Sequence, residues 1–199
     1  LQAYGVKCMS IGFLVDEGEP IIWRGPMVMG VVKQFLQDVD WKPLDVLIID
    51  LPPGTGDAQL TMIQAVELSG SVIVTTPQKV ALADATKALT MFQQAQINVP
   101  VLGVVENMAY FTPAELPENK YYIFGEGGGK RLAEKYNVPY LGEIPLVQGI
   151  RESGDSGYPA VMKEGLIAEA FGNFAENVAR QVAIRNAEMS KTEVVQIKV

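Results

Sequence analysis

The sequence predicts an α/β fold with a mainly parallel sheet and helices on both faces. Several apolar runs lack the polar alternation of a half-exposed strand, which is typical of strands buried on both faces. Helix-like segments separate these runs, and the connections between them are short. The composition supports one sizeable core, since 48% of the 199 residues are hydrophobic and 20% are charged. We therefore expect a single domain over residues 1–189, followed by a C-terminal tail over residues 190–199.

Five aliphatic segments are expected to form strands. They cover residues 6–11, 46–50, 71–76, 101–106 and 139–144. Five further segments are helix-like, over residues 27–39, 58–68, 81–94, 128–136 and 166–186. Pro26 suits the first turn of the first helix, and Pro100 separates the third helix from the next strand.

Two segments interrupt this alternation. Residues 112–120 carry two prolines and several charges. At that length the segment is more than a connector, and we interpret it as a surface lid or a partner-binding loop. Residues 191–199 alternate apolar and polar side chains after a long helix, which fits either a short edge strand or a loosely ordered tail.

The most informative segment is residues 45–57, which read DVLIIDLPPGTGD. Asp50 is expected at the carboxyl end of a buried parallel strand, where open α/β sheets place their ligands. A carboxylate there can hold Mg²⁺ through water, as in P-loop ATPases. Gly54 and Gly56 would allow the backbone to approach a terminal phosphate and to change its dihedral angles when the phosphate leaves. The alternative is that Asp50 only caps a tight turn.

Polar residues also follow the other expected strands. Thr75 and Thr76 either satisfy backbone groups at a strand end or face a ligand. Asn107 either presents an acceptor and donors to the edge of a heteroaromatic base or makes its own turn. Residues 142–147 bring a fourth strand end to the same edge of the sheet, and this convergence favours a site there.

A phosphate loop is not found in the sequence. No G-x-x-x-x-G-K-[ST] pattern occurs, and Gly129-Lys130 is followed by Arg131. Residues 125–130, GEGGGK, have the glycine content but the wrong register, and they follow a polar loop. We interpret them as a flexible start of a helix. The chain is therefore either no NTPase, or an NTPase whose phosphate loop would precede Leu1.

Charge and rare residues exclude several classes of function. The net charge of −7 argues against nucleic-acid or anionic-membrane partners, although backbone amides can still hold a small phosphorylated ligand. No signal-peptide pattern and no membrane-length apolar run is present, so we expect a cytoplasmic protein. Histidine is absent, which excludes catalytic triads that use His and metal sites that use His ligands. Cys8 is the only cysteine, and its place in an expected strand predicts a buried, inert thiol.

The chain resembles the Mrp/Nbp family of P-loop ATPases, within the larger MinD/ParA-like group that includes the nitrogenase iron protein. The resemblance covers residues 5–162. It includes, in order, MSIGFLVDEGEPIIWRGPMVMG, DVLIIDLPPGTGDAQLT, VIVTTPQKVALADATKAL, VLGVVENMAYF and YLGEIPLVQGIRESGD. It implies a homodimer that binds ATP and Mg²⁺, hydrolyses ATP, and passes an iron–sulfur cluster to apo-proteins.

The resemblance also implies roles for individual residues. Asp50 would be the catalytic carboxylate on the Mg²⁺ side, and Asn107 would read adenine. The loop that flanks the adenine would comprise Pro145, Leu146 and Val147.

Further residues match the family's second switch and its surroundings. Gln78 and Asp84 are expected to provide switch contacts and hydrogen-bond support. The switch loop itself would contain Pro53, Gly54, Thr55, Gly56 and Asp57.

Two departures from the family pattern leave alternatives open. The phosphate loop would lie before Leu1, so the 199-residue chain alone is not expected to hydrolyse ATP. Many relatives carry C-x-x-C after ENM-x-Y, whereas residues 111–118 read FTPAELPE here. Glu115 and Glu118 match iron's preference for thiolate poorly. The alternative is a nucleotide-switched dimeric partner-binding protein of the same fold that carries no cluster. A third hypothesis, a degenerate interaction domain, disagrees with the intact switch glycines and Asp50.

Overall fold

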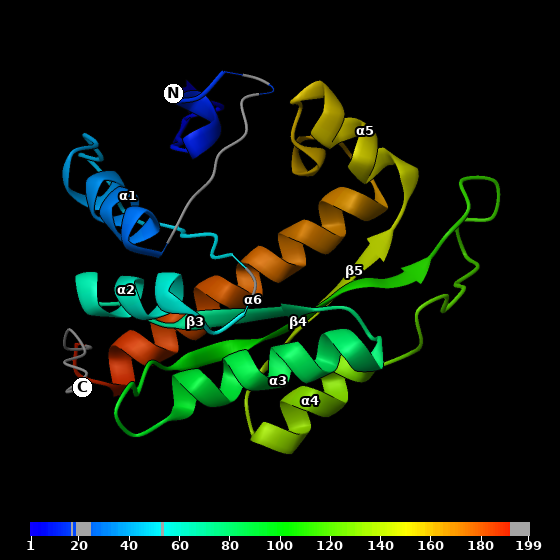
Figure 1. The fold of residues 1–199 in the computed structure, drawn as a ribbon. Coiled ribbons are helices and arrows are strands. Elements are labelled where there is room, and N and C mark those ends of the chain that lie inside the picture. The colour runs from blue at the N-terminus through cyan, green and yellow to red at the C-terminus, as the bar shows by residue number, and fades with distance from the viewer. Residues whose placement is uncertain (17, 19–24, 53, 192–199) are drawn as a thin grey trace. The chain divides into compact units, whose positions relative to one another are not determined.

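The computed structural model describes all residues except 17, 19–24, 53 and 192–199 (Figure 1). Contacts along the chain divide it into two compact units, Leu1–Val66 and Glu67–Val199.

The first unit is built from two short strands and two helices. Strands β1 (Gln2–Ala3) and β2 (Val6–Lys7) form an antiparallel ribbon, and a 3-10 turn follows at Ile11–Phe13. Helix α1 (Gly25–Gln37) packs against helix α2 (Asp57–Ala65). The ribbon is tied to the segment after α1 by the ammonium of Lys7, which donates to the carbonyl oxygens of Asp40 and Lys42 at 2.9 and 2.6 Å.

Two strand predictions in the first unit are wrong. The strand expected over residues 6–11 ends at Lys7, and Cys8 is exposed rather than buried. Residues 46–50 form no strand, and Val46 and Ile48 are 69% and 88% exposed. An apolar run becomes a strand only when its backbone groups find a partner ladder. Within the described part of the first unit, residues 46–50 have no such ladder.

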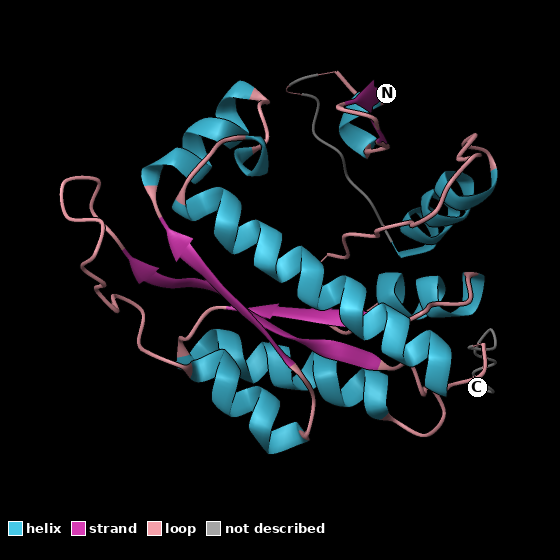
Figure 2. Ribbon diagram, turned by 180° about the vertical axis from the view of Figure 1, so that it is seen from behind, coloured by secondary structure: helices cyan, strands magenta, loops and turns pink. Residues whose placement is uncertain are grey.

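The second unit confirms the predicted α/β class. Three parallel strands lie in the order β3 (Ser71–Thr75), β4 (Val101–Phe111) and β5 (Tyr140–Leu146). Helices α3 (Lys79–Gln93) and α4 (Gly128–Tyr136) cover one face of this sheet, and α6 (Leu166–Glu188) covers the other (Figures 1 and 2). Strands β4 and β5 are therefore covered from both sides, as their apolar sequences predicted, whereas Val74 of β3 is 61% exposed.

The remaining element of the second unit links β5 to α6. Helix α5 (Gln148–Ser156) follows β5 directly, and a 3-10 turn at Ala160–Met162 precedes α6. The sequence reading missed α5, because its polar side chains lack the apolar periodicity of a core-facing helix.

The core on the α6 face joins the two longer strands to that helix. Val105 and Leu141 are buried, and partly buried Phe171, Phe174 and Val178 pack against them. This contact holds β4 and β5 together. It thereby fixes the positions of the polar residues at their carboxyl ends.

Candidate functional site

The pairing of β4 with β5 brings the expected base-reading residues together. Asn107 lies opposite Ile144, and the buried Pro145 follows on the same strand. Leu146 ends β5, and Val147 is the N-terminal cap of α5. Asn107 and the loop 145–147 are thus neighbours at the carboxyl edge of the sheet, where parallel α/β folds bind ligands.

Asn107 sits at a distortion of β4. Its side-chain Oδ1 accepts a hydrogen bond from the backbone N–H of Met108 at 2.9 Å. Met108 has φ +53, and the register with β5 shifts between Asn107 and Phe111. The Asn therefore does make its own turn, one of the two alternatives. Among the described residues its amide nitrogen has no hydrogen-bond partner, so its two N–H donors are available to a ligand.

Glu106, one residue earlier, is a buried carboxylate. It is 1% exposed, and it accepts a hydrogen bond from the backbone N–H of Gly129 in the first turn of α4. Burial raises the pKa of Glu106, the amide of Gly129 lowers it, and the charge of Glu143 on β5 raises it again. Sequence reasoning did not single out Glu106. The available signal was an acidic residue that directly follows VLGVV, because a charge in an apolar strand needs a buried partner.

The glycine-rich run before α4 serves close packing. A Cβ on Gly128 would lie 2.9 Å from the backbone oxygen of Pro77, and one on Gly129 would lie 3.1 Å from the Glu106 side chain. Gly127 caps the helix in the left-handed region, with φ +62. Residues 125–130 thus contain the start of a helix, as expected, and close packing requires glycine at positions 128 and 129. The amide that a phosphate cradle would use at Gly129 is bound to Glu106.

The raised pKa of Glu106 predicts a pH dependence of stability. A carboxyl whose pKa is higher in the folded than in the unfolded state binds more protons when folded, so its contribution falls as pH rises above the ordinary value of 4.5. We expect the free energy of unfolding of the native protein, minus that of Glu106→Gln, to decrease from pH 4.5 upward. Urea titrations of both proteins at several pH values measure this difference. A difference that increases with pH over this window contradicts the burial of the carboxylate.

The switch-like loop belongs to the first unit. Asp50 and Thr55 are exposed, Gly54 has φ +101, and Gly56 is the N-terminal cap of α2. The carbonyl oxygen of Pro52 accepts a hydrogen bond from the Gln59 side chain of α2 at 2.5 Å. Pro53 and the side chain of Asp57 lie outside the described residues. The loop thus leads directly into a helix N-terminus, with an exposed carboxylate four residues before Gly54.

Gln78 and Asp84 lie at the start of α3. Gln78 caps the helix with its backbone carbonyl, which accepts from the N–H of Leu82 at 2.9 Å. Asp84 is exposed and pairs with Lys87 at 3.3 Å. An exposed pair of this kind contributes little to stability.

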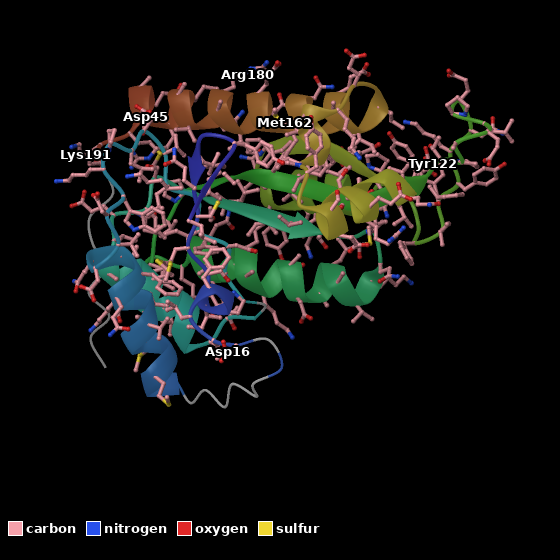
Figure 3. All side chains as sticks on the ribbon, turned by 90° about the horizontal axis from the view of Figure 1, so that it is seen from above. Asp16, Asp45, Tyr122, Met162, Arg180 and Lys191 are labelled. Carbon is pink, nitrogen blue, oxygen red and sulfur yellow. The ribbon has the colours of Figure 1, made fainter. Side chains whose placement is uncertain are left out.

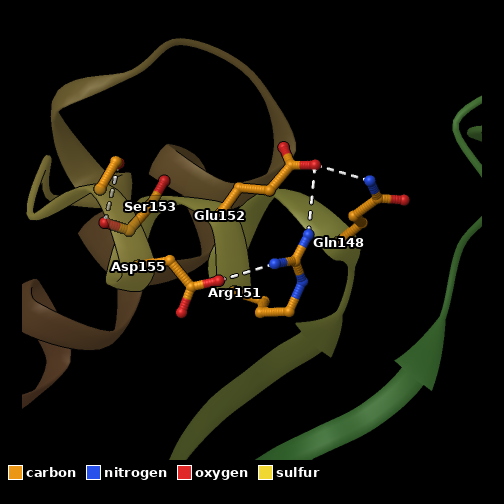
Figure 4. Close-up of polar contacts among 6 residues, drawn as sticks. Gln148, Arg151, Glu152, Ser153 and Asp155 are labelled. Carbon is orange, nitrogen blue, oxygen red and sulfur yellow. Dashed lines mark hydrogen bonds and ion pairs between the residues drawn. The ribbon is translucent and has the colours of Figure 1, made fainter.

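A polar network on α5 follows the loop 145–147 (Figure 4). Arg151 binds Asp155 at 2.6 Å and contacts Glu152 at 3.5 Å, while the amide of Gln148 donates to Glu152 at 2.6 Å. Because two of these contacts join exposed residues four positions apart on the helix, they support the helix rather than the core.

Residues 112–120 form a loop that is closed at its base. The backbones of Phe111 and Tyr121 exchange two hydrogen bonds of 2.8 and 2.9 Å, and the ammonium of Lys120 lies 4.0 Å from the Tyr110 ring centroid. Leu116 is 51% exposed, and Tyr122, also exposed, lies on the return of this loop (Figure 3). The base is therefore ordered, and the loop presents apolar surface.

No three Cys, Asp or Glu side chains of the described residues gather into a group able to hold a metal ion. Within the same residues, no helix combines the length and the apolar character needed to span a membrane.

Comparison with known proteins places this geometry in a family. Residues 1–182 match the family model described as ParA, NUBPL iron-transfer P-loop NTPase. An iron–sulfur cluster carrier protein of Synechocystis is 51% identical over 91% of this chain and 51% of its own length. The iron–sulfur cluster transfer protein NUBPL of Dictyostelium discoideum is 47% identical over 96% of this chain and 59% of its own. The chain thus spans little more than half the length of these relatives.

Solved structures give the same fold. A nucleotide-binding protein from Archaeoglobus fulgidus, solved in complex with ADP, is 42% identical with a TM-score of 0.64, over 79% of this chain and 59% of that one. The cell-division ATPase MinD of Pyrococcus furiosus has a TM-score of 0.52 at 24% identity, with the same coverage, and supports the fold alone.

Proposed function

Because the chain belongs to the ParA/NUBPL family of iron-transfer P-loop NTPases, we propose that it is part of an ATP-binding and ATP-hydrolysing iron–sulfur cluster carrier. The observation that carries the nucleotide site is the pairing of Asn107 with the strand that leads into residues 145–147. The relatives named as cluster carriers, and the neighbour solved with ADP, support the proposal.

We assign adenine recognition to Asn107. With its Oδ1 engaged by Met108, the side chain presents two N–H donors, which suit the ring-nitrogen acceptors of adenine. Pro145, Leu146 and Val147 supply an apolar flank for the flat base. Backbone groups of this loop add the few fixed polar contacts that give a base site its specificity.

We assign the phosphate side to Asp50 and the loop 53–57. Oxygen donors such as the exposed carboxylate of Asp50 are the ligands that Mg²⁺ prefers. When bound, Mg²⁺ supplies neutralisation of phosphate charge. Gly54 and Gly56 give the backbone its approach to the terminal phosphate. The amide cradle is assigned to residues other than 125–129, since Gly129 already donates to Glu106.

Homodimerisation and delivery of the cluster to apo-proteins complete the proposal, with the loop 112–120 as a contact surface. Leu116 in this loop and Tyr122 just after it are exposed, and such apolar and aromatic surface suits contact with another protein. The net charge of −7 fits a protein without nucleic-acid or membrane partners.

A second function is favoured because this chain offers few ligands for an iron–sulfur cluster. Clusters are held by thiolates, and Cys8, the single cysteine of this chain, is exposed but has no second thiol beside it in the sequence. The alternative is a nucleotide-switched dimeric protein that binds partners without a cluster, and the cysteine-free loop 112–120 favours it.

Iron and acid-labile sulfide analysis separates the two functions. The protein is expressed from its complete reading frame and purified anaerobically. If it holds a cluster, we expect ligands other than the usual pair of cysteines after ENM-x-Y. Cys8→Ser should then leave the iron content unchanged. Loss of a stable cluster in Cys8→Ser assigns Cys8 as a ligand and contradicts this expectation. Protein without iron after reconstitution selects the cluster-free alternative.

A further inference from the structure

The Glu106 carboxylate links strand β4, which carries Asn107, to the first turn of helix α4. On β4 it directly precedes Asn107, and across the face covered by α4 it accepts the N–H of Gly129. It is 1% exposed, so this contact is shielded from water. A shielded, charge-assisted hydrogen bond is stronger than a neutral one and holds its partners in a fixed geometry.

The surroundings fix this contact from both sides. On the helix side, Gly128 fits against Pro77, and no larger residue could lie there without displacing the backbone. On the strand side, Glu106 is in register with Thr75 of β3 and with Glu143 of β5. The carboxylate therefore joins the first turn of α4 to the middle of the sheet.

Directly after this anchor the strand adopts a strained conformation. Met108 lies in the left-handed region, which costs a non-glycine residue free energy. Such a conformation persists only where the surrounding structure over-determines it. The N–H of Met108 is the group that holds Asn107 Oδ1.

We propose that Glu106 is a positioning residue for base recognition: by holding β4 against the first turn of α4, it fixes the Asn107–Met108 distortion that presents the Asn107 amide donors. The proposal rests on the proposed role of Asn107 in reading adenine. It gives Gly129, in the first turn of α4, a function as the donor that holds the Glu106 carboxylate. It also makes Glu106 a determinant of base preference that touches no nucleotide itself.

The test compares variants of the protein expressed from its complete reading frame. Dissociation constants for ATP and GTP are measured by equilibrium binding, and stability by urea denaturation. We expect Glu106→Ala to weaken ATP binding about tenfold and to reduce the preference for ATP over GTP. Glu106→Gln should retain most of both, since its amide oxygen can still accept from Gly129. Glu134→Gln, at an exposed carboxylate on α4, is the control and should leave both unchanged.

Two results overturn the proposal, and they differ from failure of the proposed function. If Asn107→Ala lowers affinity and base preference while Glu106→Ala lowers only stability, Glu106 is structural and the proposal is wrong. If Asn107→Ala changes neither quantity, the role of Asn107 itself is wrong. Should Glu106→Ala not fold, Glu106→Asp withdraws the carboxylate from Gly129 by one methylene and is held to the same outcomes.

Discussion

Replacing Asp50 with Asn is expected to lower the rate of ATP hydrolysis about 100-fold, in line with the loss of one charge-stabilising group from an active site. Phosphoryl transfer depends on positioning and on neutralising charge. The amide keeps the size of the carboxylate but removes its charge, so the interaction with Mg²⁺ weakens. Because Asp50 is exposed, the substitution should leave the free energy of unfolding unchanged. Steady-state phosphate release by the protein from its complete reading frame measures the effect.

The same segment offers a matched control. Asp45 is also an exposed carboxylate, five residues earlier, and Asp45→Asn should keep the native rate. Equal rates for Asp50→Asn and the native protein contradict the assignment of the phosphate side. Equal losses in both variants indicate that the net charge of the segment matters rather than Asp50.

Gly103→Ala is expected to cause a large loss of stability, about 3 kcal/mol, from overpacking together with backbone strain. Gly103 is on β4 with φ +151, and a Cβ there would lie 2.5 Å from the carbonyl oxygen of Pro139 and 2.7 Å from Leu141. The clash is with the backbone that leads into β5, so relaxing it requires the two strands to separate. Urea denaturation followed by circular dichroism measures the change.

The control is a glycine with space around it. Gly172 lies in the second turn of α6, and no atom lies within 4 Å of a Cβ built there. Gly172→Ala should stabilise the protein by about 0.5–1 kcal/mol through helix propensity. Opposite signs at the two positions are therefore expected. A neutral Gly103→Ala contradicts the close approach of β4 to the segment before β5.

The secondary structure of segments that depend mainly on local sequence could be predicted. The helix over 128–136 has the bounds of α4, because a glycine run and a following amphipathic turn define its start and Asn137 ends it in the left-handed region. The strand expected over residues 71–76 is confirmed as Ser71–Thr75, and the strand expected over residues 101–106 forms the first part of β4, where the residues after Val101 are buried. The continuation of β4 to Phe111 was missed, because polar Asn107 and its bulge interrupt the apolar pattern.

The secondary structure and burial of segments that depend on partners distant in the sequence could not be predicted. Residues 46–50 have the composition of a buried strand but no ladder within the described part of their unit. Cys8 is exposed because β2 ends one residue before it. Position in the sequence also gave no indication that Gly129 would meet Glu106, 23 residues away. Only the crossing of α4 over β4 brings the two together.

We propose that β4 and β5 present a nucleotide base site through Asn107 and residues 145–147. A crystal structure of the protein from its complete reading frame, with Mg²⁺ and a non-hydrolysable ATP analogue, tests it most directly. We predict that the Asn107 amide nitrogen donates to the adenine ring within about 3.2 Å, with the base against Pro145, Leu146 and Val147. An adenine bound elsewhere, with Asn107 contacting only the N–H of Met108, would contradict the account.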